Sequence, residues 1–172
     1  MQGLADWFRD GYEILADVLE AADPNVECWA FMKAPTPLAF WARRQCHETA
    51  IHRADAESAS GAITPIPAAI ATDGIDELLT GFITRRGGRL KSDEPRSLAV
   101  HTDDTSADWL VRISSEAVAT TRDAADADCT VRGSASDLQL FVWNRRGVDG
   151  LRVDGDSSLL DLWRESVTIR WG

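Results

Sequence analysis

Apolar residues recur at helical spacing through the first half of the chain. Between residues 4 and 22 this spacing predicts a helix with one apolar stripe, made of Leu4, Trp7, Phe8, Leu15, Val18, Leu19 and Ala22. Thr36 followed by Pro37 is typical of a helix start, so we expect a second helix over residues 37–57. A third helix is expected over residues 67–85, before two glycines.

The apolar pattern changes from helical to alternating beyond the polar segment 91–96. Alternation predicts four short strands, over residues 97–102, 109–114, 117–121 and 128–132. Two helices should follow, one capped by the polar residues 134–137 and one beginning at Asp156, before a closing strand over residues 167–171. The chain is therefore expected to be an α+β protein with two domains, residues 1–90 and 91–172.

Composition and charge narrow the function classes. The 172 residues carry a formal net charge of −10, which argues against non-specific binding to nucleic acid or to an anionic membrane. The three cysteines are scattered, without metal-type spacing or a disulfide framework, as in a reducing compartment. No apolar run approaches a membrane span, and the first residues have no signal-peptide character. A soluble cytoplasmic protein is expected.

The chemistry is expected on the second helix. His47 and His52 are five positions apart, about 140° around a helix, so they cannot form the zinc site of an H-E-x-x-H protease. Glu48 and His52 are four positions apart and share one face. They are predicted to form half of a metal site; the alternative is an ordinary surface pair worth a few tenths of a kcal/mol.

Three arginines flank this pair. Arg43, Arg44 and Arg53 form either a solvated flank or a set of groups that recognise a carboxylate substrate.

Longer motifs carry a family resemblance over nearly the whole chain. The run at residues 40–57, FWARRQCHETAIHRADAE, with ATDGIDELL at 71–79, resembles the mycothiol-dependent maleylpyruvate isomerase family. Residues 130–138, 142–146 and 153–156 are similar to the C-terminal domain of that family. The resemblance implies a DinB-like helical bundle, here a partial one of three helices, followed by a small α+β domain similar to sterol carrier proteins.

The resemblance also implies a chemistry. In this actinobacterial family a divalent metal, usually zinc, is held by a histidine of an early helix and by the positions of Glu48 and His52. Mycothiol supplies the nucleophile for an isomerase or thiol transferase that acts on a small electrophile. Arg145, with Arg146 second, is the expected catalytic arginine of the C-terminal domain, and an anionic substrate is its expected ligand. Arg44 and Arg53 are the candidates for binding substrate or thiol.

The first metal histidine of the family has no counterpart here, because no histidine precedes His47. The chain is then a piece of a longer enzyme, a degenerate binding or regulatory module, or half of a shared site; recruitment of His101 and lipid carriage by the C-terminal domain are weaker alternatives. A bundle without its first helices would expose apolar surface around Trp7, Leu15 and Leu38. A homodimer that covers this surface is expected.

Overall fold

The computed structural model describes residues 2–85 and 87–168 of the chain. It divides into two compact units, Met1–Glu48 and Thr49–Gly172. The third predicted helix lies in the same unit as the sheet. The domain boundary expected between residues 90 and 91 stays a prediction.

The first unit holds helix α1 (Gln2–Ala21) and most of helix α2 (Pro37–Ser58), which continues into the second unit. Both helices were predicted nearly to the residue. The start of α2 shows why: the backbone N–H of Ala39 donates to the hydroxyl of Thr36 over 3.1 Å, and proline fills the first helical position. Aromatic side chains of the connecting loop pack on this start, with Phe31 edge-on against Phe40 at a centroid distance of 4.7 Å.

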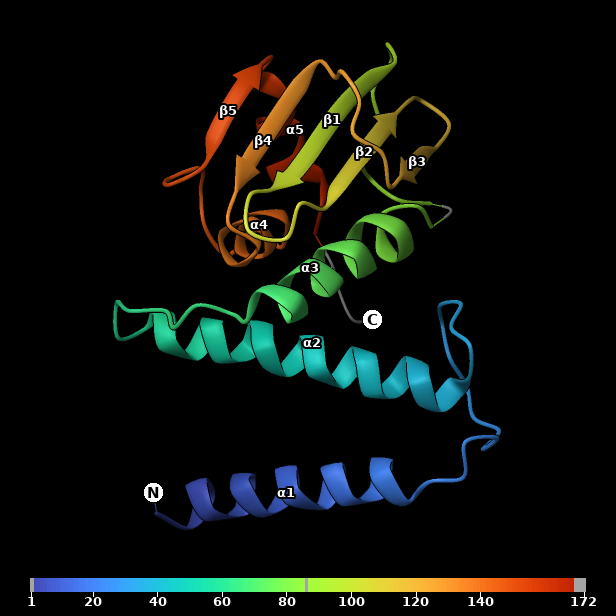
Figure 1. Ribbon diagram of the computed structural model, residues 1–172, viewed down its shortest axis with the longest axis vertical. Coiled ribbons are helices and arrows are strands. Elements are labelled where there is room, and N and C mark those ends of the chain that lie inside the picture. Colours follow the sequence, from blue (N-terminus) through green and yellow to red (C-terminus); the bar gives the residue numbers. More distant parts are fainter. Residues whose placement is uncertain (1, 86, 169–172) are drawn as a thin grey trace. The chain divides into compact units, whose positions relative to one another are not determined.

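The second unit is built on a five-stranded sheet (Figure 1). Its strand order is β3-β2-β1-β4-β5, and the strands are β1 (Arg96–Thr102), β2 (Asp108–Ile113), β3 (Val118–Thr121), β4 (Cys129–Gly133) and β5 (Arg152–Gly155). Central strands β1 and β4 run parallel, and the other neighbours run antiparallel. The α+β class is confirmed.

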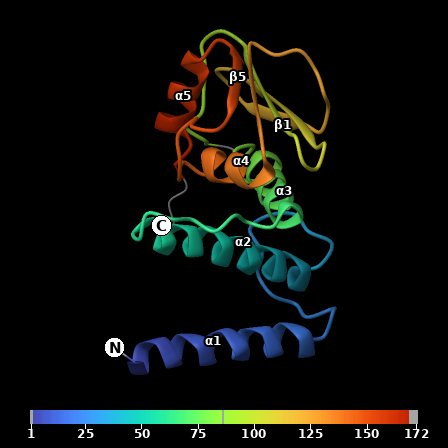
Figure 2. The ribbon, with the colours of Figure 1, turned by 60° about the vertical axis from the view of Figure 1, so that its left-hand side comes forward.

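Helices gather on one face of this sheet (Figure 2). They are α3 (Ala68–Asp76), the π-helical segment η1 (Glu77–Phe82), α4 (Ala135–Val142) and α5 (Ser158–Ser166). Alternate strand residues point at them and form a core with helix residues, including Leu98, Val100, Val111, Val131, Leu138, Leu159 and Trp163. The indole of Trp163 donates to the carbonyl of Val142 over 3.1 Å, so α5 is fastened to α4.

The structure differs from the sequence prediction in one helix and one strand, and a further predicted strand is not tested. The helix predicted over residues 67–85 changes to π geometry at Glu77, where the N–H of Ile83 reaches back to the carbonyl of Leu78 over 3.1 Å. Strand β5 was missed, because Arg152–Gly155 has neither an apolar run nor β-branched residues apart from one valine. The closing strand predicted over residues 167–171 falls mostly outside the described residues.

Candidate functional site

The buried face of helix α2 is not the face that carries Glu48 and His52. Its buried side chains are those of Phe40, Arg44, His47, Ile51 and Ala54, at helical spacing. Glu48 is only partly buried, and His52 is exposed. Of the two alternatives for Arg44, a solvated flank is excluded, because its side chain is buried.

Glu48 lies against a buried arginine in the first unit. The guanidinium of Arg44 donates to Oε1 of Glu48 from Nε over 3.1 Å, and its Nη2 lies 2.9 Å from the same oxygen. The Arg44 side chain is 2% exposed, and the carboxylate of Glu48 offsets part of the cost of burying its charge. Arg44 was a candidate for binding substrate or thiol. In the structure it contacts Glu48, which was predicted to be a metal ligand.

His52, Asp55 and Arg145 come together in the second unit. Arg145 donates from Nε to Oδ1 of Asp55 over 2.9 Å and from Nη2 to Oδ2 over 3.1 Å. Nδ1 of His52 lies 3.1 Å from Oδ2 of the same carboxylate. Asp55 thus contacts both His52, on α2, and Arg145, which follows α4. Asp55 and Arg145 are 90 positions apart in the chain.

The pKa of Asp55 reflects its contacts with Arg145 and His52. Burial acts to raise the pKa of Asp55, but the hydrogen bond and charge of Arg145, with those of His52, outweigh it and hold the pKa below its ordinary value of 3.8. Arg145 is further oriented by donating from Nη1 to the carbonyl of Trp143 over 2.9 Å. The cluster is partly open, with the His52 side chain 62% exposed. A molecule in solvent can therefore reach it.

Asp55 was not among the site residues predicted from the sequence. The available signal was its place three residues after His52, one helical turn further on the same side. Its pairing with Arg145 had no local signal, because it depends on how α2 and α4 meet in the fold.

The other two candidate arginines have local structural partners. Arg53 donates to the carbonyl of Thr64 over 3.1 Å and lies 3.5 Å from Oε1 of Glu57. These contacts connect the C-terminal end of α2 to the loop that follows it. Arg146 pairs with Asp137 of α4. Neither contact tests the roles in binding and catalysis expected for these residues, so those roles stay predictions.

The donor groups of the described residues are too few for a catalytic zinc ion. Catalytic zinc sites use three protein ligands and a water. Within residues 2–85 and 87–168, no three His, Cys, Asp or Glu side chains are grouped so that they could hold a metal ion. Glu48 is in addition engaged by Arg44. The described residues therefore do not fit a complete metal site.

Family models match both halves of the chain. The model of the mycothiol maleylpyruvate isomerase N-terminal domain matches residues 1–57, and that of the MDMPI C-terminal domain matches residues 69–162. No match to a curated protein was found. None of the helices that the structure describes is long and apolar enough to cross a membrane.

Three solved structures show weaker similarities, each with a TM-score below 0.5. The stereoselective inverting sec-alkylsulfatase Pisa1 from Pseudomonas sp. is 14% identical, with 44% of this chain and 13% of that chain covered and a TM-score of 0.38. The UbiJ-SCP2 ubiquinone synthesis protein is 28% identical, covers 56% of this chain and 92% of its own, and has a TM-score of 0.39. Sterol carrier protein 2 from Yarrowia lipolytica (apo form) is 13% identical, with 61% and 95% covered and a TM-score of 0.36. The chain spans a small part of the sulfatase, whereas the MDMPI C-terminal model alone matches more than half of this chain. The chain belongs to the mycothiol maleylpyruvate isomerase family.

Proposed function

We propose that this protein acts in mycothiol-dependent isomerisation or thiol transfer on a small, anionic electrophile, with Arg145 as the group that binds the anion. The observation that carries the proposal is the convergence of Arg145 and His52 on Asp55. A guanidinium that uses two nitrogens on two carboxylate oxygens has the geometry by which arginine recognises carboxylates in general. With Asp55 on Nε and Nη2 and the carbonyl of Trp143 on Nη1, Arg145 keeps one further N–H on each Nη nitrogen, and a substrate carboxylate would bind to these two.

The proposed chemistry needs no net oxidation. The thiolate sulfur of mycothiol adds to the electron-poor carbon of a double bond conjugated to a carbonyl group, and the electron pair moves to the carbonyl oxygen. The former double bond is then a single bond and can rotate. Return of the electron pair expels the thiolate and restores the double bond in the trans form. Arg145 would hold the anionic end of the substrate during rotation. A cytoplasmic location, where small thiols stay reduced, goes with this proposal.

The test is turnover of maleylpyruvate by the purified chain with and without mycothiol. Arg145→Gln should raise KM, because the variant loses a charged contact that substrate and transition state both use. Arg152→Gln, an exposed arginine of β5, is the matched control and should leave KM unchanged. Turnover that does not require mycothiol, or equal effects of the two variants, would reject the proposed role.

A second candidate function is a binding or regulatory module of the same family. The observation that favours it is the lack, among the described residues, of three donors that could hold a metal. Metal analysis of the purified chain separates the two candidates. About one zinc per chain, lost in both Glu48→Ala and His52→Ala, would support these ligands together with one from elsewhere. A metal-free protein without turnover would support the module.

We propose further that two copies associate through α1. Its side chains Leu4, Trp7 and Phe8 are each 70% exposed, a fraction that favours burial against an apolar partner. Light scattering at tens of micromolar should give the mass of a dimer, and Trp7→Lys should shift it toward the monomer. A monomeric wild-type chain at these concentrations would contradict the idea.

A further inference from the structure

The residue before Arg145 determines where the backbone of Arg145 lies at the end of α4. The N–H of Arg145 donates to the carbonyl of Leu140 over 2.7 Å, and the N–H of Asn144 donates to the carbonyl of Phe141 over 2.9 Å. Asn144 itself has a positive φ of 57°. Two such hydrogen bonds around one left-handed residue form the Schellman motif, which ends many helices. The course of the chain into Arg145 therefore depends on Asn144.

The backbone conformation of Asn144 does not by itself explain its side chain. Glycine adopts a positive φ without steric cost and is the usual residue at this position of the motif. Asparagine tolerates the left-handed conformation better than most residues with a side chain, but it adopts it less readily than glycine does. A stabilising contact of the side chain would offset this difference.

The amide of Asn144 binds the C-terminal end of α5. Its Nδ2 donates to the carbonyl oxygen of Val167 over 2.7 Å and lies 3.4 Å from that of Arg164. Carbonyl groups at the end of a helix have no partner within the helix, so this amide satisfies acceptors that α5 cannot satisfy itself. One turn earlier in α5, the buried indole of Trp163 donates to the carbonyl of Val142 over 3.1 Å. α5 therefore holds the end of α4 at two points.

The side chain of Arg145 depends on the same segment. Nη1 of Arg145 donates to the carbonyl of Trp143 over 2.9 Å. Trp143 lies between Val142 and Asn144, the two residues that α5 contacts. The backbone of Arg145 and the acceptor of its Nη1 are thus both placed by contacts with α5. From this position Nε and Nη2 donate to Asp55.

We infer that Asn144 is a positioning residue for Arg145. By binding the end of α5, its amide keeps the guanidinium in the orientation in which it contacts Asp55. A guanidinium that is fixed beforehand loses less conformational entropy when it binds a carboxylate. The effect on substrate binding rests on the proposed function, whereas the effect on the contact with Asp55 does not depend on it.

Two variants separate the amide from the backbone conformation. Asn144→Gly adopts a positive φ freely but lacks the amide. Asn144→Asp keeps the size of the side chain and tolerates a positive φ, but its carboxylate cannot donate to the carbonyl of Val167. Both variants should therefore release Arg145 while α4 still ends at the same residue.

The Nε–H resonance of Arg145 in the NMR spectrum of the full chain reports on the contact with Asp55. This resonance is assigned by its loss in Arg145→Gln. We expect its exchange with water to be about tenfold faster in both Asn144 variants, because the Nε–H spends more time away from the carboxylate. KM for maleylpyruvate, measured with mycothiol, should also rise about tenfold, with a smaller change in kcat.

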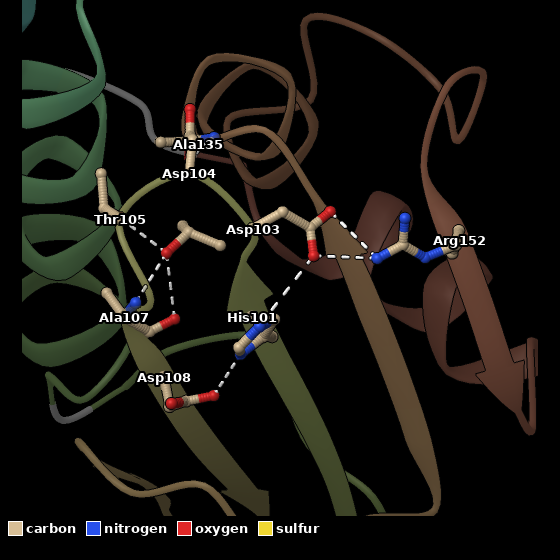
Figure 3. Close-up of polar contacts among 9 residues, drawn as sticks. His101, Asp103, Asp104, Thr105, Ala107, Asp108, Ala135 and Arg152 are labelled. Atoms are coloured by element: carbon tan, nitrogen blue, oxygen red, sulfur yellow. Dashed lines mark hydrogen bonds and ion pairs between the residues drawn. The ribbon is translucent and has the colours of Figure 1, made fainter.

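Asp104→Ala is the matched control, because it loosens the opposite end of the same helix. The N–H of Ala135, the first residue of α4, donates to Oδ1 of Asp104 over 2.9 Å (Figure 3). Loss of this contact should lower the stability of the protein and leave both the Nε–H exchange and KM unchanged. Trp163→Phe covers the case in which both Asn144 variants are unstable. It removes the indole donor to Val142 but keeps an aromatic ring, and it should also speed the exchange.

Unchanged Nε–H exchange in Asn144→Gly and Asn144→Asp, or an equal change in Asp104→Ala, would overturn the inference. Faster exchange with an unchanged KM would support the positioning of Arg145 and reject its proposed role in substrate binding. A wild-type chain without mycothiol-dependent turnover would reject the proposed function, and the Nε–H exchange would then decide the inference without KM.

Discussion

The contact between Asp55 and Arg145 should be measurable as a coupling energy in the free energy of unfolding. The perturbations are Asp55→Asn, Arg145→Gln and the double variant, which together form a double-mutant cycle. Asparagine keeps the shape and an acceptor oxygen but removes the charge. The cycle therefore isolates the charged part of the interaction.

The expected size follows from the geometry. Two short hydrogen bonds join the pair, which places it at the strong end for ion pairs. The side chains of Arg145 and Asp55 are 33% and 36% exposed, so water screens much of the attraction. Exposed pairs contribute about 0.2–1 kcal/mol, and we expect a coupling of about 1 kcal/mol at pH 7. A loss of this size should lower the melting temperature of a 172-residue chain by about 3 °C.

The pH dependence gives an independent check. The pKa of Asp55 in the folded protein is held below its ordinary value of 3.8. The ionised carboxylate of Asp55 therefore stabilises the folded protein fully above pH 3.8. This stabilisation is lost as the pH falls through the lower pKa of the folded state. Thermal unfolding followed by circular dichroism should show the difference between wild type and Asp55→Asn shrinking over this acidic range.

A matched pair elsewhere controls for general charge effects. Arg152 and Asp103 also form an ion pair, at 2.8 Å, but through one nitrogen and with the arginine 66% exposed. The same cycle at this pair should give a smaller coupling. A coupling of zero for Asp55 and Arg145 at pH 7, or a difference that persists unchanged at acidic pH, would refute the structural argument for the cluster.

Three further predictions concern stability and thiol reactivity. Gly155 has φ of 90°, and a Cβ there would lie 2.2 Å from the carbonyl oxygen of Asp128, so Gly155→Ala should cost about 3 kcal/mol in urea unfolding. Gly150→Ala, at a φ of 84° with nothing within 4 Å of the added Cβ, should cost only about 1 kcal/mol; equal losses would contradict the clash. Ser134→Ala should cost about 1 kcal/mol in the same assay, because the Ser134 hydroxyl accepts the N–H of Asp137 at the start of α4, and a neutral result would show that the cap is dispensable. Burial raises the pKa of the Cys129 thiol, so a thiol reagent followed by mass spectrometry should label the two exposed cysteines of the native protein and reach Cys129 only after unfolding.

Much of the fold could be predicted from the sequence, because local sequence signals and tertiary packing favour the same elements. The helix start at Thr36 and the cap at Ser134 were both predicted from residue type and are both made in the structure. Strands β1, β2 and β4 follow the alternation of apolar residues, since one side of each faces the helices. Strand β5 carries no such alternation, and its pairing with β4 is what defines it.

The candidate site could be predicted only in part, because some of its contacts join residues that are far apart in the sequence. The family motif identified His52 and Arg145, which the structure brings to one carboxylate. It did not identify Asp55 as the link, because an ion pair between residues 90 positions apart leaves no local pattern. The buried position of Arg44 was also missed, since arginine is seldom buried unless a carboxylate such as that of Glu48 accompanies it.

The two outer strands of the sheet have a consequence for how the protein avoids aggregation. β3 and β5 are each four residues long, so each offers a short row of backbone groups to another sheet. β5 also carries Arg152 and Asp154 and ends at Gly155, whose positive φ turns the backbone away from a straight edge. Charged, short and bent edges resist the addition of further strands. Self-association of this protein should therefore proceed through side chains of helices and leave the sheet at five strands.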